Sequence, residues 1–285
     1  MVNSKELFLE FRNSLTLEDE NNELEAIVYL VFDSILGLSS TDIMIGRQVE
    51  LTPEVKKQLT TIAIRINSGE PVQYILEEAW FLNRKFAVDS NVLIPRPETE
   101  ELVKLIATEC RYDNFTVLDI GTGSGCISIS LKLECPNIRI KATDISTEAL
   151  IIAMKNAGRL NAEVEFLHHD ILTEEIPFDT LDIIVSNPPY VLKRESEFLQ
   201  ERVVKFEPHL ALFTPDDDPL KFYNVIAAKG IAALKSGGKI FVEINQQFGK
   251  EVANLFSDAG FESVTIQKDI FGNDRIVMGK KSKNV

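Results

Sequence analysis

The fold of this chain is decided by residues 117–128, which read VLDIGTGSGCIS. The apolar run Thr116 to Ile120 is typical of a short buried strand, and it leads directly into the glycine-rich stretch Gly121 to Gly125. Glycines between a strand and a helix let a ligand approach the backbone closely. The segment therefore predicts a strand, a ligand-binding turn and a helix that continues through Leu133.

The chain beyond this segment repeats the alternation of strands and helices. Further strands are predicted at residues 138–143, 164–167, 181–186, 239–244, 264–268 and 275–279. Further helices are predicted at residues 146–160, 220–234 and 246–259. Such alternation implies a mostly parallel sheet with helices on both faces, so we predict a doubly wound α/β domain.

The first 75 residues have a different pattern. Apolar residues at helical spacing predict helices over residues 5–13 and 23–36, and Thr52-Pro53 is a start signal for another helix, with Thr52 as N-cap. Strand formers interrupted by turn residues follow and predict a hairpin. We therefore expect a small helical recognition bundle at residues 1–75, a β-hairpin linker at 76–95 and a catalytic domain at 96–285.

Composition narrows the class of protein. Hydrophobic side chains make up 45% of the 285 residues, which is ordinary for a globular protein, and no apolar run is long enough to span a membrane. The N-terminal residues lack the pattern of a signal peptide, and the three cysteines show no metal-ligand spacing. We expect a cytoplasmic monomer without a metal. The net charge of −14 argues against direct nucleic-acid binding.

Three acidic residues at predicted strand ends indicate the cofactor. The glycine loop has Cys126 where a dinucleotide site has its last glycine, and it lacks the lysine of a phosphate loop. Asp119 would repel a phosphate but could hold an ammonium group, Asp144 is placed to accept both hydroxyls of a ribose, and Asp170 could accept from an adenine amino group. A ribose, an adenine and a cationic amino acid without phosphate describe S-adenosylmethionine.

The predicted strand Leu181 to Ser186 ends at the sequence Asn187-Pro188-Pro189-Tyr190. Two successive prolines cannot continue a central strand, and they hold the backbone stiff where it ends. The Asn187 oxygen and the Pro188 carbonyl could accept the two hydrogens of an –NH₂ group, while the Tyr190 ring could pack on a planar substrate. For the tetrapeptide alone, a simple Pro-Pro turn that leaves a strand is an equal alternative.

A third stretch, Pro95 to Glu100, alternates prolines with charged residues. It predicts a stiff, exposed start of a helix, with Glu98 or Thr99 as the cap. A helix start without further function is the alternative interpretation.

Together these stretches resemble the class I S-adenosylmethionine-dependent methyltransferases, and closely the HemK/PrmC family of protein-(glutamine-N5) methyltransferases. The resemblance covers nearly the whole chain. It rests on GEPVQYI at 69–75, VLIPRPETE at 92–100, VLDIGTGSGCIS at 117–128, VSNPPY at 185–190, and the pairs Glu207-Pro208, Ala211-Leu212, Lys268-Asp269 and Asp274-Arg275. The NPPY tetrapeptide is shared with adenine methyltransferases, so VLIPRPETE is what makes the match specific.

Two positions depart from the pattern of that family. Glu77 stands where the family often has glycine, and Asn245 stands where Glu-Ile-Gly is usual. We expect both departures to affect local turns without touching the two main motifs.

The resemblance implies a Rossmann-like fold and an activity. The methyl group of S-adenosylmethionine would pass to the side-chain amide nitrogen of the glutamine in the Gly-Gly-Gln motif of peptide chain release factors, leaving S-adenosylhomocysteine. The implied catalytic and substrate-binding residues are Asn187, Pro188, Pro189 and Tyr190, joined for substrate binding by Arg96 and Glu98. The expected cofactor-binding residues are Asp119, Gly121, Thr122, Gly123, Ser124, Gly125, Asp144, Asp170, Ile171 and Asn187.

Finer expectations follow for single residues. By resemblance, Asn187 and the Pro188 carbonyl take the two N–H bonds of the substrate amide. Residues 96–99 are expected to fold over the cofactor end of the site, with Glu98 making the contact. No general base is required, and the three histidines, His168, His169 and His209, are expected to be structural or exposed.

Two other functions share parts of this pattern. An adenine-N6 or other nucleic-acid amino methyltransferase would use the same tetrapeptide on a flipped base, but it would need a basic cleft that a net charge of −14 disfavours. A non-catalytic binding module could keep the fold. The combination of glycine loop, acidic residues and NPPY favours the enzyme.

Overall fold

The computed structural model describes residues 1–16, 21–110 and 114–283. These residues form two compact units. The first unit contains Met1–Glu78 and Gln200–Phe206, and the second contains Ala79–Leu199 and Glu207–Val285. The short segment 200–206 differs from the predicted division, which placed it in the catalytic domain.

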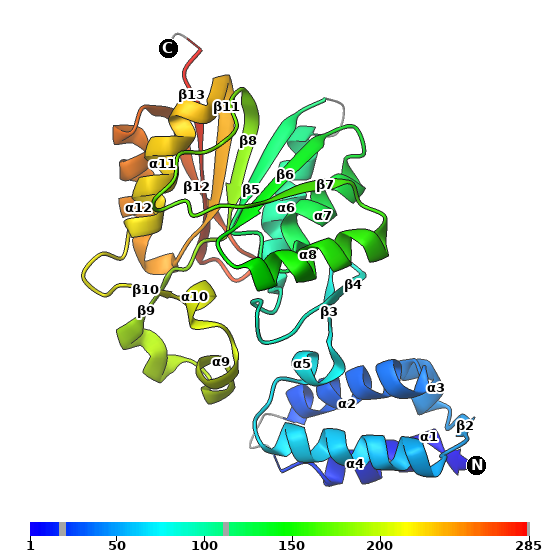
Figure 1. Cartoon of the computed structure of the whole chain (residues 1–285). Helices are drawn as coiled ribbons and strands as arrows, with labels where there is room; N and C mark the ends of the chain where they lie inside the picture. The colour runs from blue at the N-terminus through cyan, green and yellow to red at the C-terminus, as the bar shows by residue number, and fades with distance from the viewer. Residues whose placement is uncertain (17–20, 111–113, 284–285) are drawn as a thin grey trace. The chain divides into compact units, whose positions relative to one another are not determined.

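The first unit is a bundle of short helices (Figure 1). Its helices are α1 (Ser4–Asn13), α2 (Asn21–Leu36), α3 (Ser40–Met44), α4 (Pro53–Asn67), α5 (Val72–Leu76) and α9 (Glu201–Phe206), with an antiparallel strand pair β1 (Val2–Asn3) and β2 (Gln48–Val49). As predicted, Thr52 caps α4, because its hydroxyl oxygen accepts the backbone N–H of Val55 at 3.3 Å. An ion pair between Arg202 and Glu23 joins α9 to α2.

The second unit contains a seven-stranded sheet with the strand order β12-β13-β11-β8-β5-β6-β7. The strands are β5 (Thr116–Ile120), β6 (Arg139–Asp144), β7 (Val164–His168), β8 (Leu181–Ser186), β11 (Leu234–Glu243), β12 (Phe261–Lys268) and β13 (Asp274–Lys281). Strand β13 is antiparallel to both of its neighbours, whereas β11, β8, β5, β6 and β7 pair in parallel. The predicted doubly wound, mostly parallel sheet is therefore confirmed.

Helices cover both faces of this sheet (Figure 1). One face packs against α6 (Pro97–Cys110), α7 (Cys126–Glu134) and α8 (Thr147–Leu160), and the other packs against α11 (Lys221–Ala233) and α12 (Gly249–Asp258). Strand β5 serves both layers, because successive side chains of a strand point to opposite faces. Val117 belongs to the apolar cluster with α6 and α7, and Leu118 belongs to the cluster with α11 and α12.

Local sequence signals account for the connection that was predicted, and their absence accounts for the connections that were not. The hairpin of β3 (Glu78–Phe81) and β4 (Arg84–Ala87) turns at Leu82 and Asn83, which both have positive φ, as in a two-residue type I′ turn. Between β8 and α11 the sequence predicted no elements. In addition to α9, the structure has the short elements β9 (Val191–Leu192), η1 (Lys193–Phe198), α10 (His209–Leu212) and β10 (Phe213–Thr214) there. Elements of this length give no periodic pattern.

Two predicted helix starts need correction. Helix α6 begins at Pro97, so neither Glu98 nor Thr99 caps it; the backbone N–H of Thr99 instead donates to Arg96 at 3.1 Å within the first turn. The helix predicted at 246–259 is divided into a 3₁₀ turn, η2 (Gln246–Phe248), and α12. None of the helices in the described part of the chain is both long and apolar enough to cross a membrane.

Gly125 sets how closely α7 and α8 approach. It precedes α7 with φ +80°, and a Cβ atom at this position would lie 2.8 Å from Ile129 Cδ1 and 3.2 Å from Ala153 Cβ. A side chain here would be strained and would also push α8 away. Gly158, inside α8, has helical backbone geometry and open space where a Cβ would point.

We therefore expect opposite effects from two matched substitutions. Gly125→Ala should lower the free energy of unfolding by roughly 1–3 kcal/mol, because it combines left-handed strain with a steric clash. Gly158→Ala should raise it by about 0.5–1 kcal/mol, since alanine restricts the unfolded chain and favours a helix. Urea unfolding of both variants measures this. A Gly125→Ala variant as stable as the native chain would contradict the packing described.

Candidate active site

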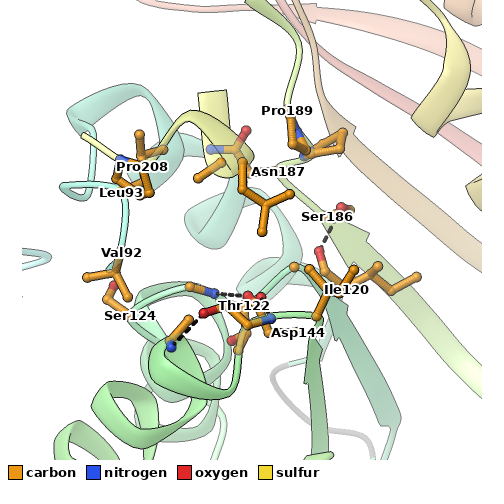
Figure 2. Close-up of a pocket in the computed structure, with 18 of the residues that line it drawn as sticks. Val92, Leu93, Ile120, Thr122, Ser124, Asp144, Ser186, Asn187, Pro189 and Pro208 are labelled. Carbon is orange, nitrogen blue, oxygen red and sulfur yellow. Dashed lines mark hydrogen bonds between the residues drawn. The ribbon is translucent and has the colours of Figure 1, made fainter. Parts of the chain in front are cut away.

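A cavity of about 260 Å³ lies where the parallel strands end (Figure 2). Its volume is far above the roughly 10–15 Å³ that one water molecule needs on the same measure, so it suits a ligand. Most of the predicted site residues line it: Arg96, Gly121, Thr122, Gly123, Ser124, Asp144, Asp170, Ile171, Asn187, Pro188 and Pro189. Asp119, Gly125, Glu98 and Tyr190 are not among its lining residues.

The glycine loop is held open on its cavity side. A Cβ atom at Gly121 or Gly123 would meet nothing within 4 Å, so a ligand can reach the backbone there. The loop is fixed from behind by Asn156 of α8, whose Nδ2 donates to the carbonyls of Ser124 and Ala87 at 2.9 Å each. The sequence analysis missed Asn156, because a polar residue within an amphipathic helix gives no sign of its partner.

Asp144 joins the end of β6 to the glycine loop. Its carboxylate accepts the backbone N–H of Gly123 at 2.8 Å and that of Ser146 at 2.9 Å. Burial raises the pKa of Asp144, and these two backbone N–H groups only partly offset that effect. A carboxylate oxygen can accept more than one hydrogen bond, so the residue can still accept ribose hydroxyls as predicted.

Asp119 is fully buried beside the cavity wall, in contact with Thr122. The Thr122 hydroxyl donates to Asp119 Oδ2 at 2.6 Å, whereas Oδ1 has no hydrogen-bond partner among the described residues. Burial raises the pKa of Asp119 to about 6, although hydrogen bonds with Thr122 and Ser128 oppose it. An unpaired, buried carboxylate oxygen suits a nearby cation, so the residues fit the ammonium group of S-adenosylmethionine. Direct contact with that group stays a prediction.

Asp170 and its neighbours also line the cavity. Asp170 accepts the backbone N–H of Leu172 at 2.9 Å and the hydroxyl of Thr173 at 2.8 Å. Burial opposes ionisation, but these hydrogen bonds outweigh it and lower the pKa of Asp170. His169, which we expected to be structural or exposed, also lines the cavity, and its Nε2 contacts the Glu175 carbonyl at 2.9 Å.

The NPPY loop is anchored to a buried carboxylate that the sequence analysis did not identify. Asn187 Nδ2 donates to Thr99 Oγ1 at 3.3 Å, and the Thr99 hydroxyl donates to Glu243 Oε2 at 2.7 Å. The Tyr190 hydroxyl donates to Glu243 Oε1 at 3.0 Å. Tyr190 is thus bonded behind the cavity wall, and packing of its ring on a substrate stays a prediction. The sequence did contain a signal for Glu243, because it is the one charged residue in the otherwise apolar run 240–244.

Residues around the start of α6 reach the cavity. Arg96 and Thr99 line the cavity and Glu98 does not, so a ligand contact of Glu98 stays a prediction. Arg96 Nη2 lies 2.6 Å from Glu207 Oε1, and Glu207 also accepts the backbone N–H of Ile94 at 3.2 Å. This buried carboxylate therefore joins the VLIPRPETE stretch to the segment that follows α9.

One departure from the family pattern touches a main motif, contrary to expectation. Asn245 Nδ2 donates to the Tyr190 carbonyl at 3.3 Å and to Glu195 Oε2 at 3.1 Å. Glu195 also accepts from the side chain of Gln247 at 2.6 Å. Asn245 thus helps to hold the loop that leaves the NPPY sequence.

The chain matches family models over both of its units. Residues 6–76 match the PrmC N-terminal domain, and residues 97–209 match the methyltransferase small domain. A release factor glutamine methyltransferase of Bacteroides thetaiotaomicron is 44% identical over 260 residues, which cover 91% of this chain and 93% of that protein. One from Streptococcus pneumoniae is 41% identical over 96% of both chains.

A solved structure supports the fold. A methyltransferase from Pyrococcus furiosus superposes with a TM-score of 0.51 over 69% of this chain and 88% of that chain. Because the two sequences are only 19% identical, the likeness shows the fold alone.

The raised pKa of Asp119 gives a prediction for cofactor binding. Below pH 6 the carboxyl is protonated and loses its attraction for an ammonium group, so binding must first remove a proton. We expect the dissociation constant for S-adenosylmethionine to be flat from pH 6.5 to 7.5 and to rise up to about tenfold per pH unit below pH 6. Calorimetry across this range measures it. Asp119→Asn should bind more weakly at pH 7 with a flatter profile; an unaltered acid limb would exclude Asp119.

Asp144 gives a second prediction for the same ligand. Asp144→Ala removes the acceptor for ribose hydroxyls and the anchor of the Gly123 N–H, so the dissociation constant for S-adenosylmethionine should rise at every pH. Loss of hydrogen bonds to a charged group typically costs about 1.5–3 kcal/mol, or roughly tenfold to 100-fold in affinity. Native affinity in this variant would count against the ribose contact.

Proposed function

The chain belongs to the family of release factor glutamine methyltransferases, and we propose on this premise that it methylates the side-chain amide nitrogen of the glutamine in the Gly-Gly-Gln motif of peptide chain release factors. The observation that carries the proposal is the position of Asn187. Asn187 lines the same cavity as Thr122 and Ser124 of the glycine loop and Asp144 (Figure 2), and Pro188 is also a lining residue. Groups that can hold an –NH₂ therefore face the groups that fit the methyl donor.

The chemical problem is a weak nucleophile. The nitrogen of a carboxamide shares its lone pair with the carbonyl, so alignment with the methyl group is the main task of the protein. S-adenosylmethionine, when bound, supplies the activated methyl group on a sulfonium centre. Asn187 Oδ1 and the Pro188 carbonyl would accept the two N–H groups of the glutamine and fix the direction of its nitrogen.

The same acceptors would act on the charge that develops. As the new C–N bond forms and the C–S bond to the sulfonium breaks, positive charge grows on the amide nitrogen, and fixed carbonyl dipoles would stabilise it. Pro188 and Pro189 hold the backbone stiff, so these dipoles need little reorganisation. The methylated nitrogen then loses its extra proton readily, so no side chain has to act as a base before the transfer.

The net charge of the chain bears on the kind of substrate that it binds. A net charge of −14 supports a protein substrate rather than nucleic acid. We assign recognition of the release factor to the first unit, because its helices carry none of the cavity residues. A monomer in the cytoplasm, without contact to nucleic acid, is the form that we propose.

Asn187→Ala tests the assigned role. The variant should leave binding of S-adenosylmethionine largely intact but lose on the order of 10²-fold or more in turnover, because one acceptor for the developing charge is gone. Turnover is measured as transfer of labelled methyl groups to a purified release factor. A variant with native turnover would remove Asn187 from the mechanism.

The acceptor is identified in the same assay. The release factor is compared with its Gly-Gly-Ala variant and with duplex DNA. Label on the native factor alone supports glutamine methylation. Label on DNA, or equal label on the Gly-Gly-Ala variant, would overturn the proposed substrate.

A further inference from the structure

Glu243 is a buried carboxylate to which the proposed mechanism gives no task. It is the last residue of β11 and only 1% exposed. Its two oxygens bond to side chains from two separate segments, Thr99 at the start of α6 and Tyr190 at the end of the NPPY sequence. A buried charge is costly unless it is well paired, so a carboxylate at this position calls for an explanation.

The environment of Glu243 contains opposing influences. Burial raises the pKa of Glu243 and outweighs the hydrogen bonds from Thr99 and Tyr190 and the positive charge of Arg275, which lower it. Glu98 is a further negative charge that raises the pKa. Arg275 is itself held by Asp269, whose Oδ2 lies 3.2 Å from the guanidinium. The arrangement thus supplies two hydroxyl donors and one cation to the ionised form.

The directions of these hydrogen bonds are not interchangeable. When Glu243 is ionised it can only accept, and the single hydroxyl hydrogen of Thr99 then points to Glu243, which is the direction found at 2.7 Å. Thr99 Oγ1 can then only accept from its other neighbour, which is Asn187. The carboxamide of Asn187 must therefore turn its NH₂ group to Thr99, and Nδ2 is the atom found 3.3 Å from Oγ1.

We propose that Glu243 and Thr99 are positioning residues that fix which end of the Asn187 carboxamide serves the substrate. The inference rests on the proposed function, because it concerns a substrate that donates N–H groups. The oxygen and nitrogen ends of a carboxamide have nearly the same shape, so only the hydrogen-bond network distinguishes them. With the NH₂ end occupied by Thr99, Asn187 offers an acceptor to the substrate.

This polarity defines the substrate class. An acceptor at Asn187 matches the –NH₂ of a glutamine side chain and opposes the oxygen of a glutamate side chain. A carboxamide turned around would offer N–H groups and would bind an oxygen instead. Glu243 also bonds Tyr190, so one carboxylate holds both ends of the NPPY sequence.

The variant Thr99→Val removes this link with little change of shape. It deletes the acceptor for Asn187 Nδ2, so we expect kcat to fall roughly tenfold to 100-fold while the dissociation constant for S-adenosylmethionine stays at its native value. Thr99→Ser keeps the hydroxyl and should recover most of the activity. Equal losses in both variants would show that Thr99 matters for packing alone.

A double-mutant cycle separates positioning from general damage. If Thr99 acts through Asn187, Thr99→Val should cost little further turnover in a chain that already carries Asn187→Ala. If the two losses in kcat simply multiply, the residues act independently and the proposal fails.

A second readout does not depend on activity. In ¹⁵N-labelled protein, the side-chain amide resonance of Asn187 is the one that disappears in Asn187→Ala. It should shift in Thr99→Val and in Glu243→Gln, but stay close to its native position in Thr99→Ser. An unmoved resonance in Thr99→Val overturns the network, even where the native enzyme methylates the release factor.

The two readouts keep this inference apart from the proposed function. A native protein that does not methylate the release factor, but whose Asn187 resonance responds as described, would overturn the substrate and keep the hydrogen-bond network. A resonance that shifts without any loss of kcat in Thr99→Val would overturn the positioning role.

Discussion

The register of three parallel strands is the constraint on which the site depends. Ile120 at the end of β5 lies opposite Thr143 of β6 on one side and Ser186 of β8 on the other. The next residues along the three strands are Gly121, Asp144 and Asn187, so the glycine loop, the ribose acceptor and the carboxamide leave the sheet at one level. Parallel pairing brings together residues that are 23 to 66 positions apart, and a slip of one residue would turn each side chain to the other face.

Buried charge is the second theme of the structure. Asp119, Glu207 and Glu243 are all buried, although isolated carboxylates are costly away from water. Each one binds a segment that borders the cavity: Asp119 holds the glycine loop through Thr122, Glu207 holds Arg96, and Glu243 holds the NPPY loop. Apolar residues would pack at these positions at lower cost, but they could not fix the direction of hydrogen bonds. At this site, the buried carboxylates fix the positions of the loops at a cost in folding stability.

The sequence predicted what depends on local pattern. The strand Leu181–Ser186 and the cap at Thr52 were found where predicted, because an apolar run and a Thr-Pro pair are local signals. The pairing of Thr99 with Glu243 could not be predicted, since the two residues are 144 positions apart and meet only when α6 packs beside the end of β11. The same limit applies to residues 200–206, whose place in the first unit is set by long-range contacts.

The two departures from the family pattern have different physical consequences: one strains the local backbone, and the other adds tertiary hydrogen bonds. Glu77 follows α5 as its C-cap with φ +56°, a left-handed conformation that glycine adopts without strain, which gives a physical reason for the glycine that the family pattern led us to expect. Glu77 accepts roughly 1 kcal/mol of strain there. Asn245, in contrast, adds stabilising contacts. A glycine could not bond to Tyr190 and Glu195, whereas the asparagine side chain adds donors that brace the loop behind the carboxamide. A rigid NPPY loop can thus be reached from different sequences, provided that the direction of each hydrogen bond around Asn187 is preserved.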